Sequence, residues 1–187
     1  MDPSVRARVD ALLPLKECIR PRKPRELREW VSAKCRAFTQ FPELRKPVLL
    51  HEGPFKWFHE EIYPLGLFAF RRYGDRDDVL CVPVRDPSRD IDAEIREPSR
   101  TIRLEITDAR EPGEHLRMEY LVEHRRVSLT GGLKVKGTKR TGRRIENVLD
   151  AEDHGVSRDH HLDWIKTAAE GKAGGAGTER PTSFSSR

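Results

Sequence analysis

The sequence has no apolar run that approaches the length of a membrane-spanning helix. Its first residues, Met1-Asp2-Pro3-Ser4, also lack the basic and then apolar pattern of a secretory signal. We therefore expect a cytoplasmic chain that does not cross a membrane.

Cysteine is scarce, and its spacing fits no known framework. The three cysteines, Cys18, Cys35 and Cys81, are far apart and form no Cys-x-x-Cys pair. An odd number of dispersed cysteines indicates a reducing compartment, without a disulfide framework or a zinc knuckle. The chain also lacks a Gly-x-Gly-x-x-Gly loop and a P-loop, so no nucleotide or organic cofactor is predicted.

The chain has few apolar residues and many charged ones. Of its 187 residues, 36% are hydrophobic and 36% are charged, which predicts one packed domain together with segments that do not pack. The last of these segments, residues 171–187, is rich in Gly, Ser and Thr and is expected to be a disordered tail. The formal net charge of +5 favours an anionic partner, with nucleic acid ahead of an acidic membrane surface, although it could also serve only solubility.

The first half of the chain predicts helices and then strands. Ser4 is expected to cap a first helix that Pro14 ends or bends, and Pro24 is expected to begin a second helix. That second helix has a helical apolar stripe, made of Leu27, Trp30, Val31, Cys35 and Phe38. We treat residues 1–50 as an N-terminal helical segment and residues 51–170 as an α/β core domain.

The core domain is expected to begin with a short helix over 55–62. This helix should stop at Tyr63-Pro64, because a residue before proline avoids the helical conformation. Strands are predicted over 67–73 and 79–84, and Pro83 places the second of them at a sheet edge or makes it end there.

Two alternating segments, 90–95 and 101–107, predict an antiparallel hairpin with its turn at 96–100. Alternate side chains of a strand point to opposite faces. The apolar face then holds Ile91, Ala93, Ile95, Ile102, Leu104 and Ile106. The polar face holds Asp90, Asp92, Glu94, Arg103, Glu105 and Thr107.

After the hairpin the pattern predicts a helix over 115–122, short strands over 127–129 and 133–136, and a turn-rich loop over 137–144. Asp159 is expected to cap a last helix that carries Leu162, Ile165 and Ala169. The fold class is therefore α+β or three-layer α/β, with a central, mostly antiparallel mixed sheet flanked by helices.

The carboxylates of the hairpin suggest a site for a hard divalent cation. Mg²⁺ takes oxygen ligands and keeps several waters, so two or three carboxylates are enough to hold it. Asp90, Asp92 and Glu105 are the candidate ligands. The plainer alternative is that this polar face is only solvated, with weak surface ion pairs to neighbouring arginines.

These residues and the order of elements resemble the PD-(D/E)XK nuclease-like superfamily over about residues 55–170. In that resemblance Glu60 or Glu61 matches the helical Glu of the family, and Asp90 or Asp92 matches the motif Asp. Glu105 matches the motif Glu. The resemblance implies a restriction-endonuclease-like core and a Mg²⁺-dependent phosphodiesterase in which Glu105, Asp90, Asp92 and Glu60 are catalytic.

The chain departs from the family at one position. Thr107 stands where the family has its catalytic lysine. Lys134, Lys136 or Arg103 could take over that role, and Arg103 has the matching face on the same strand. The other reading is a member that has lost catalysis and kept the fold.

Residues 125–144 contain eight cations and no acid. Glycines and threonines lie between the cations, which suits contact with a phosphate backbone, although the segment could also be a solvated loop. The predicted nucleic-acid contacts are Lys134, Lys136, Lys139, Arg140, Arg143 and Arg144.

Three functions follow from these observations. The first is a metal-dependent nuclease or a degenerate relative of one. The second is a noncatalytic nucleic-acid-binding protein, and the third is an accessory interaction protein that uses its N-terminal helices and its tail.

Overall fold

The computed structural model of the chain describes residues 2–86, 88–107, 114–125, 132–137, 144–148, 162–163 and 165–170. Contacts within it define two compact units. The first unit is Met1–Ile106 with His115–Val127, and the second is Thr107–Glu114 with Ser128–Arg187.

Helix α1 (Pro3–Leu12) begins two residues earlier than expected. Asp2, not Ser4, is its N-cap, and the Asp2 carboxylate accepts the Ser4 N–H at 2.8 Å. Pro3 explains the shift, because its fixed φ suits the first turn and its missing N–H is not needed there. Pro14 follows the C-cap Leu13, as predicted, and precedes the short helix α2 (Leu15–Cys18).

Helix α3 (Pro24–Phe38) begins at the predicted proline. Leu27, Val31 and Phe38 of its apolar stripe are buried, and Trp30 and Cys35 pack against the same core. The next elements are the 3₁₀ turn η1 (Pro42–Leu44), α4 (Arg45–Leu49), α5 (Pro54–Trp57), the π-helical turn η2 (Phe58–Ile62) and α6 (Tyr63–Tyr73).

The prediction that the helix stops at Tyr63-Pro64 was wrong, and so was the strand predicted over 67–73. The chain passes through Pro64 as a helix because η2 is a wide turn, in which the Tyr63 N–H bonds the Phe58 carbonyl five residues earlier. Pro64 then occupies the first turn of α6, where its missing N–H costs no hydrogen bond. Residues 67–73 continue that helix.

Strands β1 (Leu80–Pro83), β2 (Ala93–Glu97) and β3 (Arg100–Leu104) form an antiparallel sheet in the order β1-β2-β3. The predicted hairpin is confirmed, with Ile95 paired to Ile102, but its turn is shorter than expected because pairing continues to Glu97 and Arg100. Pro83 ends the edge strand β1, as predicted. An isolated bridge between Cys81 and Arg22 covers part of the outer edge of β1.

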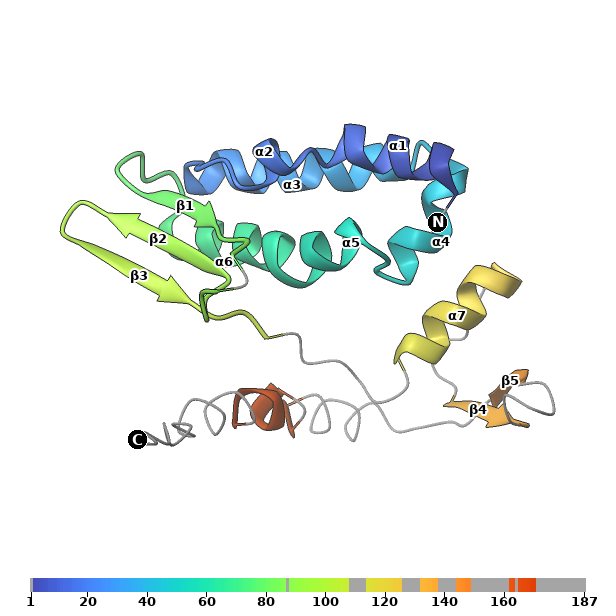
Figure 1. Cartoon of the computed structure of the whole chain (residues 1–187). Helices are drawn as coiled ribbons and strands as arrows, with labels where there is room; N and C mark the ends of the chain where they lie inside the picture. Colours follow the sequence, from blue (N-terminus) through green and yellow to red (C-terminus); the bar gives the residue numbers. More distant parts are fainter. Residues whose placement is uncertain are drawn as a thin grey trace, which may run out of the picture. The chain divides into compact units, whose positions relative to one another are not determined.

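One hydrophobic core joins the helices of this unit to its sheet (Figure 1). Helices α3 and α6 approach closely, since a Cβ on Gly66 would lie only 3.0 Å from Val31 Cγ2. The sheet contributes Cys81, Ala93 and Ile95 to the same core, and Ile102, Leu104 and Ile106 pack against it. The boundary expected at residue 50 therefore falls inside one compact unit.

The later elements are α7 (Glu114–His124), β4 (Gly132–Lys136) and β5 (Arg144–Val148), with β4 and β5 antiparallel. The helix predicted over 115–122 and the strand predicted over 133–136 are confirmed. Strand β5 was not anticipated. Residues 162–163 and 165–170 are helical, as predicted, whereas the strand predicted over 127–129, the Asp159 cap and the tail lie outside the described residues.

The fold class is thus confirmed in its coarse form, as helices with a three-stranded antiparallel sheet. Within the described residues, no helix combines the length and the apolar character that crossing a membrane requires.

Candidate functional site

Asp92 joins the ends of all three strands of the sheet. Its N–H donates to the Leu104 carbonyl of β3 at 2.9 Å, and its carbonyl accepts the Val84 N–H, just beyond β1, at 2.9 Å. Its carboxylate oxygen Oδ2 accepts the Ile106 N–H at 2.6 Å. These bonds hold Asp92 in a fixed place at the open end of the hairpin.

The Ile106 nitrogen belongs to the peptide that links it to Glu105, so the Asp92 carboxylate lies directly against the backbone of Glu105. The structure therefore places the Asp92 carboxylate beside the backbone of a second predicted ligand, Glu105. Glu105 is exposed, and so is Asp90, which forms no hydrogen bond or ion pair within the described residues.

Glu94, a further carboxylate of the predicted polar face, is used differently. It is only 7% exposed and lies between two arginines, Arg89 and Arg96, with Arg96 Nη2 at 2.9 Å from Glu94 Oε2. Hydrogen bonds from Arg89 and then Arg96 lower the pKa of Glu94 below its usual value. A carboxylate that is already neutralised by two guanidinium groups is a poor metal ligand, so we assign Glu94 a structural role.

The described residues contain no group of three or more His, Cys, Asp or Glu side chains placed to hold a metal ion. Glu60, the predicted helical carboxylate, therefore does not complete such a group with Asp92 and Glu105. Mg²⁺ is nevertheless often held by one or two carboxylates together with water and substrate phosphate oxygens. The Asp92–Glu105 pair fits that smaller donor set.

Glu60 belongs to a second cluster, which the sequence did not indicate. The imidazoles of His51 and His59 stack with ring centres 4.8 Å apart and planes within 9° of parallel. His51 Nδ1 lies 3.5 Å from Glu60 Oε1, and both side chains are largely buried. The rings of Phe38, Phe55, Phe58 and Tyr63 surround His59.

Two irregular features of the backbone occur at this cluster. His59 and Glu60 lie in the wide turn η2, and His51 has a φ of 51°, which is unusual for a residue with a side chain. Both features recur at functional sites. The only sequence signal was the Gly53-Pro54 pair, which marks an irregular loop but does not predict a stacked histidine pair.

The basic segment, which comprises residues 125–144, is described only in part. Lys136 is exposed in β4 and pairs in register with Arg144 of β5, whereas Lys134 pairs with Glu146. Lys139, Arg140 and Arg143 lie outside the described residues. The hairpin register thus places two of the predicted phosphate contacts, Lys136 and Arg144, directly across from each other.

Comparison with known proteins identifies no relative: no family model matches the chain, and no curated protein or solved structure is significantly similar to it.

Proposed function

We propose that this chain is a nuclease-like protein that processes nucleic acid, with a Mg²⁺ site at Asp92 and Glu105. The observation that carries the proposal is the contact of the Asp92 carboxylate with the peptide that follows Glu105. The proposal includes a restriction-endonuclease-like core, supported by the order of α6, the three antiparallel strands and α7.

The Ile106 N–H fixes one oxygen of Asp92, while the remaining lone pairs of that carboxylate stay available to a ligand. Glu105 supplies a second carboxylate from the residue that follows the adjoining strand β3. Bound Mg²⁺ would lower the pKa of a coordinated water and offset charge on the phosphate. Arg103, two residues before Glu105 and therefore on the same side of β3, is placed to attract the phosphate.

The basic segment supplies affinity in this proposal. The β4–β5 register puts the cationic residues Lys136 and Arg144 at the same position of the hairpin. Binding of a phosphate backbone through such cations is independent of base sequence and sensitive to salt.

The test is cleavage of plasmid DNA and of single-stranded DNA and RNA with Mg²⁺. We expect Asp92→Asn and Glu105→Gln to reduce cleavage by about a hundredfold or more, because metal ligands contribute several kcal/mol to the transition state. The asparagine retains an acceptor for the Ile106 N–H, so this variant should stay folded. Glu97→Gln, at the turn end of the same hairpin, is the matched control and should cleave normally. Equal cleavage by all three variants would contradict the proposed site.

The second candidate is a noncatalytic nucleic-acid-binding protein, and Thr107 in place of the motif lysine favours it. This function predicts binding without cleavage. The salt slope of binding should then fall by about one unit in Lys136→Ala. Binding that depends on Lys136 without any cleavage would select this candidate, and the absence of binding at low salt would remove both.

A further inference from the structure

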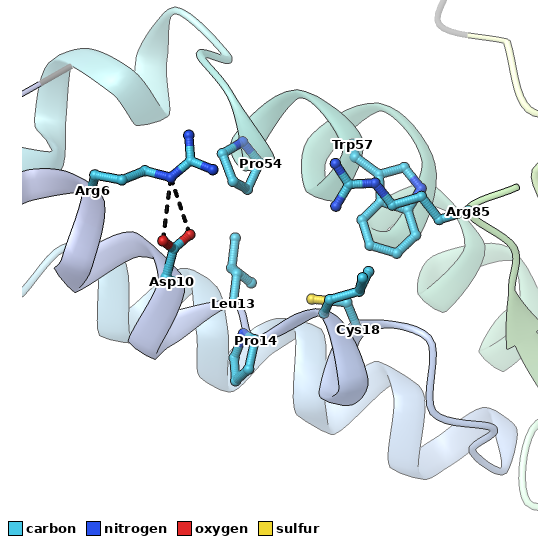
Figure 2. A pocket seen from close by; sticks show the side chains of 9 residues that line it. Arg6, Asp10, Leu13, Pro14, Cys18, Pro54, Trp57 and Arg85 are labelled. Carbon is cyan, nitrogen blue, oxygen red and sulfur yellow. Dashed lines mark hydrogen bonds and ion pairs between the residues drawn. The ribbon is translucent and has the colours of Figure 1, made fainter. Parts of the chain in front are cut away.

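A pocket of about 300 Å³ opens between the α1–α2 junction and α5, inside the first unit (Figure 2). Its apolar walls include Leu13 and Pro14 on one side and Pro54 on the other. It shares no residue with the Asp92–Glu105 pair or with the His51–His59–Glu60 cluster. Its volume is at the lower end for small-molecule sites, which suits a metabolite-sized ligand better than a polymer.

Two arginines give the pocket a positive charge. Arg6 bonds Asp10 through Nε alone, at 3.2 and 3.3 Å, and its two terminal nitrogens extend past Asp10 toward Pro54 (Figure 2). Arg85 lies over the Trp57 ring, with its guanidinium carbon 5.0 Å from the ring centre. Arg85 forms no ion pair within the part of the chain that the structure describes, so two cations face one carboxylate.

The other polar groups of the pocket add no negative charge. Burial raises the pKa of the Cys18 thiol to about 11, so it is neutral at physiological pH. The indole N–H of Trp57 is buried and has no hydrogen-bond acceptor among the residues that the structure describes, and a buried donor in that state is uncommon. The pocket therefore offers donors and positive charge over apolar walls.

We propose that this pocket binds a small organic anion, with its carboxylate or phosphate headgroup between Arg6 and Arg85 and its apolar body against Leu13, Pro14 and Pro54. The headgroup gains charge-assisted hydrogen bonds from guanidinium groups, which favour planar oxyanions. The body gains from leaving water, because apolar surface buried in the pocket is stabilised in proportion to its area. The site is independent of the nuclease-like function.

Isothermal titration of the full chain with four probes tests this proposal. Benzoate and phenyl phosphate carry both a headgroup and a body, inorganic phosphate carries only the headgroup, and benzyl alcohol carries only the body. We expect benzoate or phenyl phosphate to bind at least about tenfold more tightly than either incomplete probe. The tighter of the two identifies the headgroup. Binding should also shift the NMR signal of the Trp57 indole N–H, assigned with Trp57→Phe.

Variants locate the binding. Arg85→Gln should weaken it by about tenfold. Leu15→Glu, which places a carboxylate at an exposed position of the pocket wall, should do the same by repulsion. Arg8→Gln is the matched control, because it removes an equal charge from α1 outside the pocket and should leave binding unchanged. The proposal is overturned if neither complete probe binds, if benzyl alcohol binds as tightly as they do, or if Arg85→Gln and Leu15→Glu bind like the wild type.

Discussion

The two polar clusters of the first unit depend on different kinds of backbone structure. The hairpin carboxylates Asp92 and Glu105 lie just beyond the paired strands β2 and β3, where backbone hydrogen bonds and the Ile106 N–H hold Asp92 in place. The cluster of His51, His59 and Glu60 instead depends on a wide helical turn and on a positive φ.

The difference shows where each cluster is vulnerable. The hairpin is held by local bonds between neighbouring strands, so a change at its polar end should stay local. The histidine cluster is held by an aromatic shell that belongs to the core of the unit, with Phe58 and Phe55 fully buried beside His59. Its geometry should therefore depend on the packing of the whole unit.

Removal of the Phe58 ring should have the largest effect. Phe58 is fully buried and contacts the rings of Trp30, Phe38 and His59, so Phe58→Ala should lower the free energy of unfolding by about 3–5 kcal/mol. Urea denaturation measures this loss. Phe68→Ala, at a residue 47% exposed on α6, is the control and should cost about 0.5 kcal/mol or less. Similar losses in both variants would mean that η2 is not anchored by the core.

The positive φ of His51 provides the next test. A left-handed conformation costs a residue with a Cβ about 1–2 kcal/mol, and glycine avoids that cost. The free energy of unfolding of His51→Gly should therefore be about 1 kcal/mol higher than that of His51→Ala. Both variants lose the stacking with His59. Chemical denaturation of the two variants gives the difference. If alanine proved the more stable, the strained loop conformation would be wrong.

The local signals in the sequence predicted most elements of the fold. Pro24 and the stripe behind it predicted α3, and alternation predicted the β2–β3 hairpin with its apolar face on the core. The prediction failed at Tyr63-Pro64, because the tendency of proline to end a helix does not allow for a wide turn just before it. That turn is favoured by tertiary packing of Phe58 and Ile62, which no local pattern reveals.

Only part of the candidate site, like only part of the fold, could be predicted from local sequence patterns. Strand alternation put Asp90, Asp92 and Glu105 on one predicted face, but it did not choose between Asp90 and Asp92. The hydrogen bond from the Ile106 N–H to Asp92 was not foreseen, because it replaces a backbone acceptor with a side chain at an irregular strand end. The neutralisation of Glu94 depends on Arg89, which lies before the strand in a loop with no periodic pattern.

The pH dependence of stability should reveal the role of Glu94, with an effect no larger than that of the His51 variants. Its pKa in the folded chain lies below the usual 4.5 because Arg89 and Arg96 favour the carboxylate. The stabilisation is therefore complete above about pH 4.5 and is lost as the pH falls through the lower, folded-state pKa. Both arginines are partly exposed, so Glu94→Gln should cost about 1 kcal/mol at pH 7.

Urea denaturation of the wild type and Glu94→Gln from pH 7 to about pH 3 should show this difference narrowing as the wild-type carboxylate takes up its proton. Glu29→Gln, on the exposed face of α3 and without an ion pair among the described residues, should follow the wild-type profile throughout. A constant gap between Glu94→Gln and the wild type would mean that the arginines stabilise Glu94 by packing and not by charge. The hairpin would then resemble the histidine cluster, because its polar end would depend on packing as well.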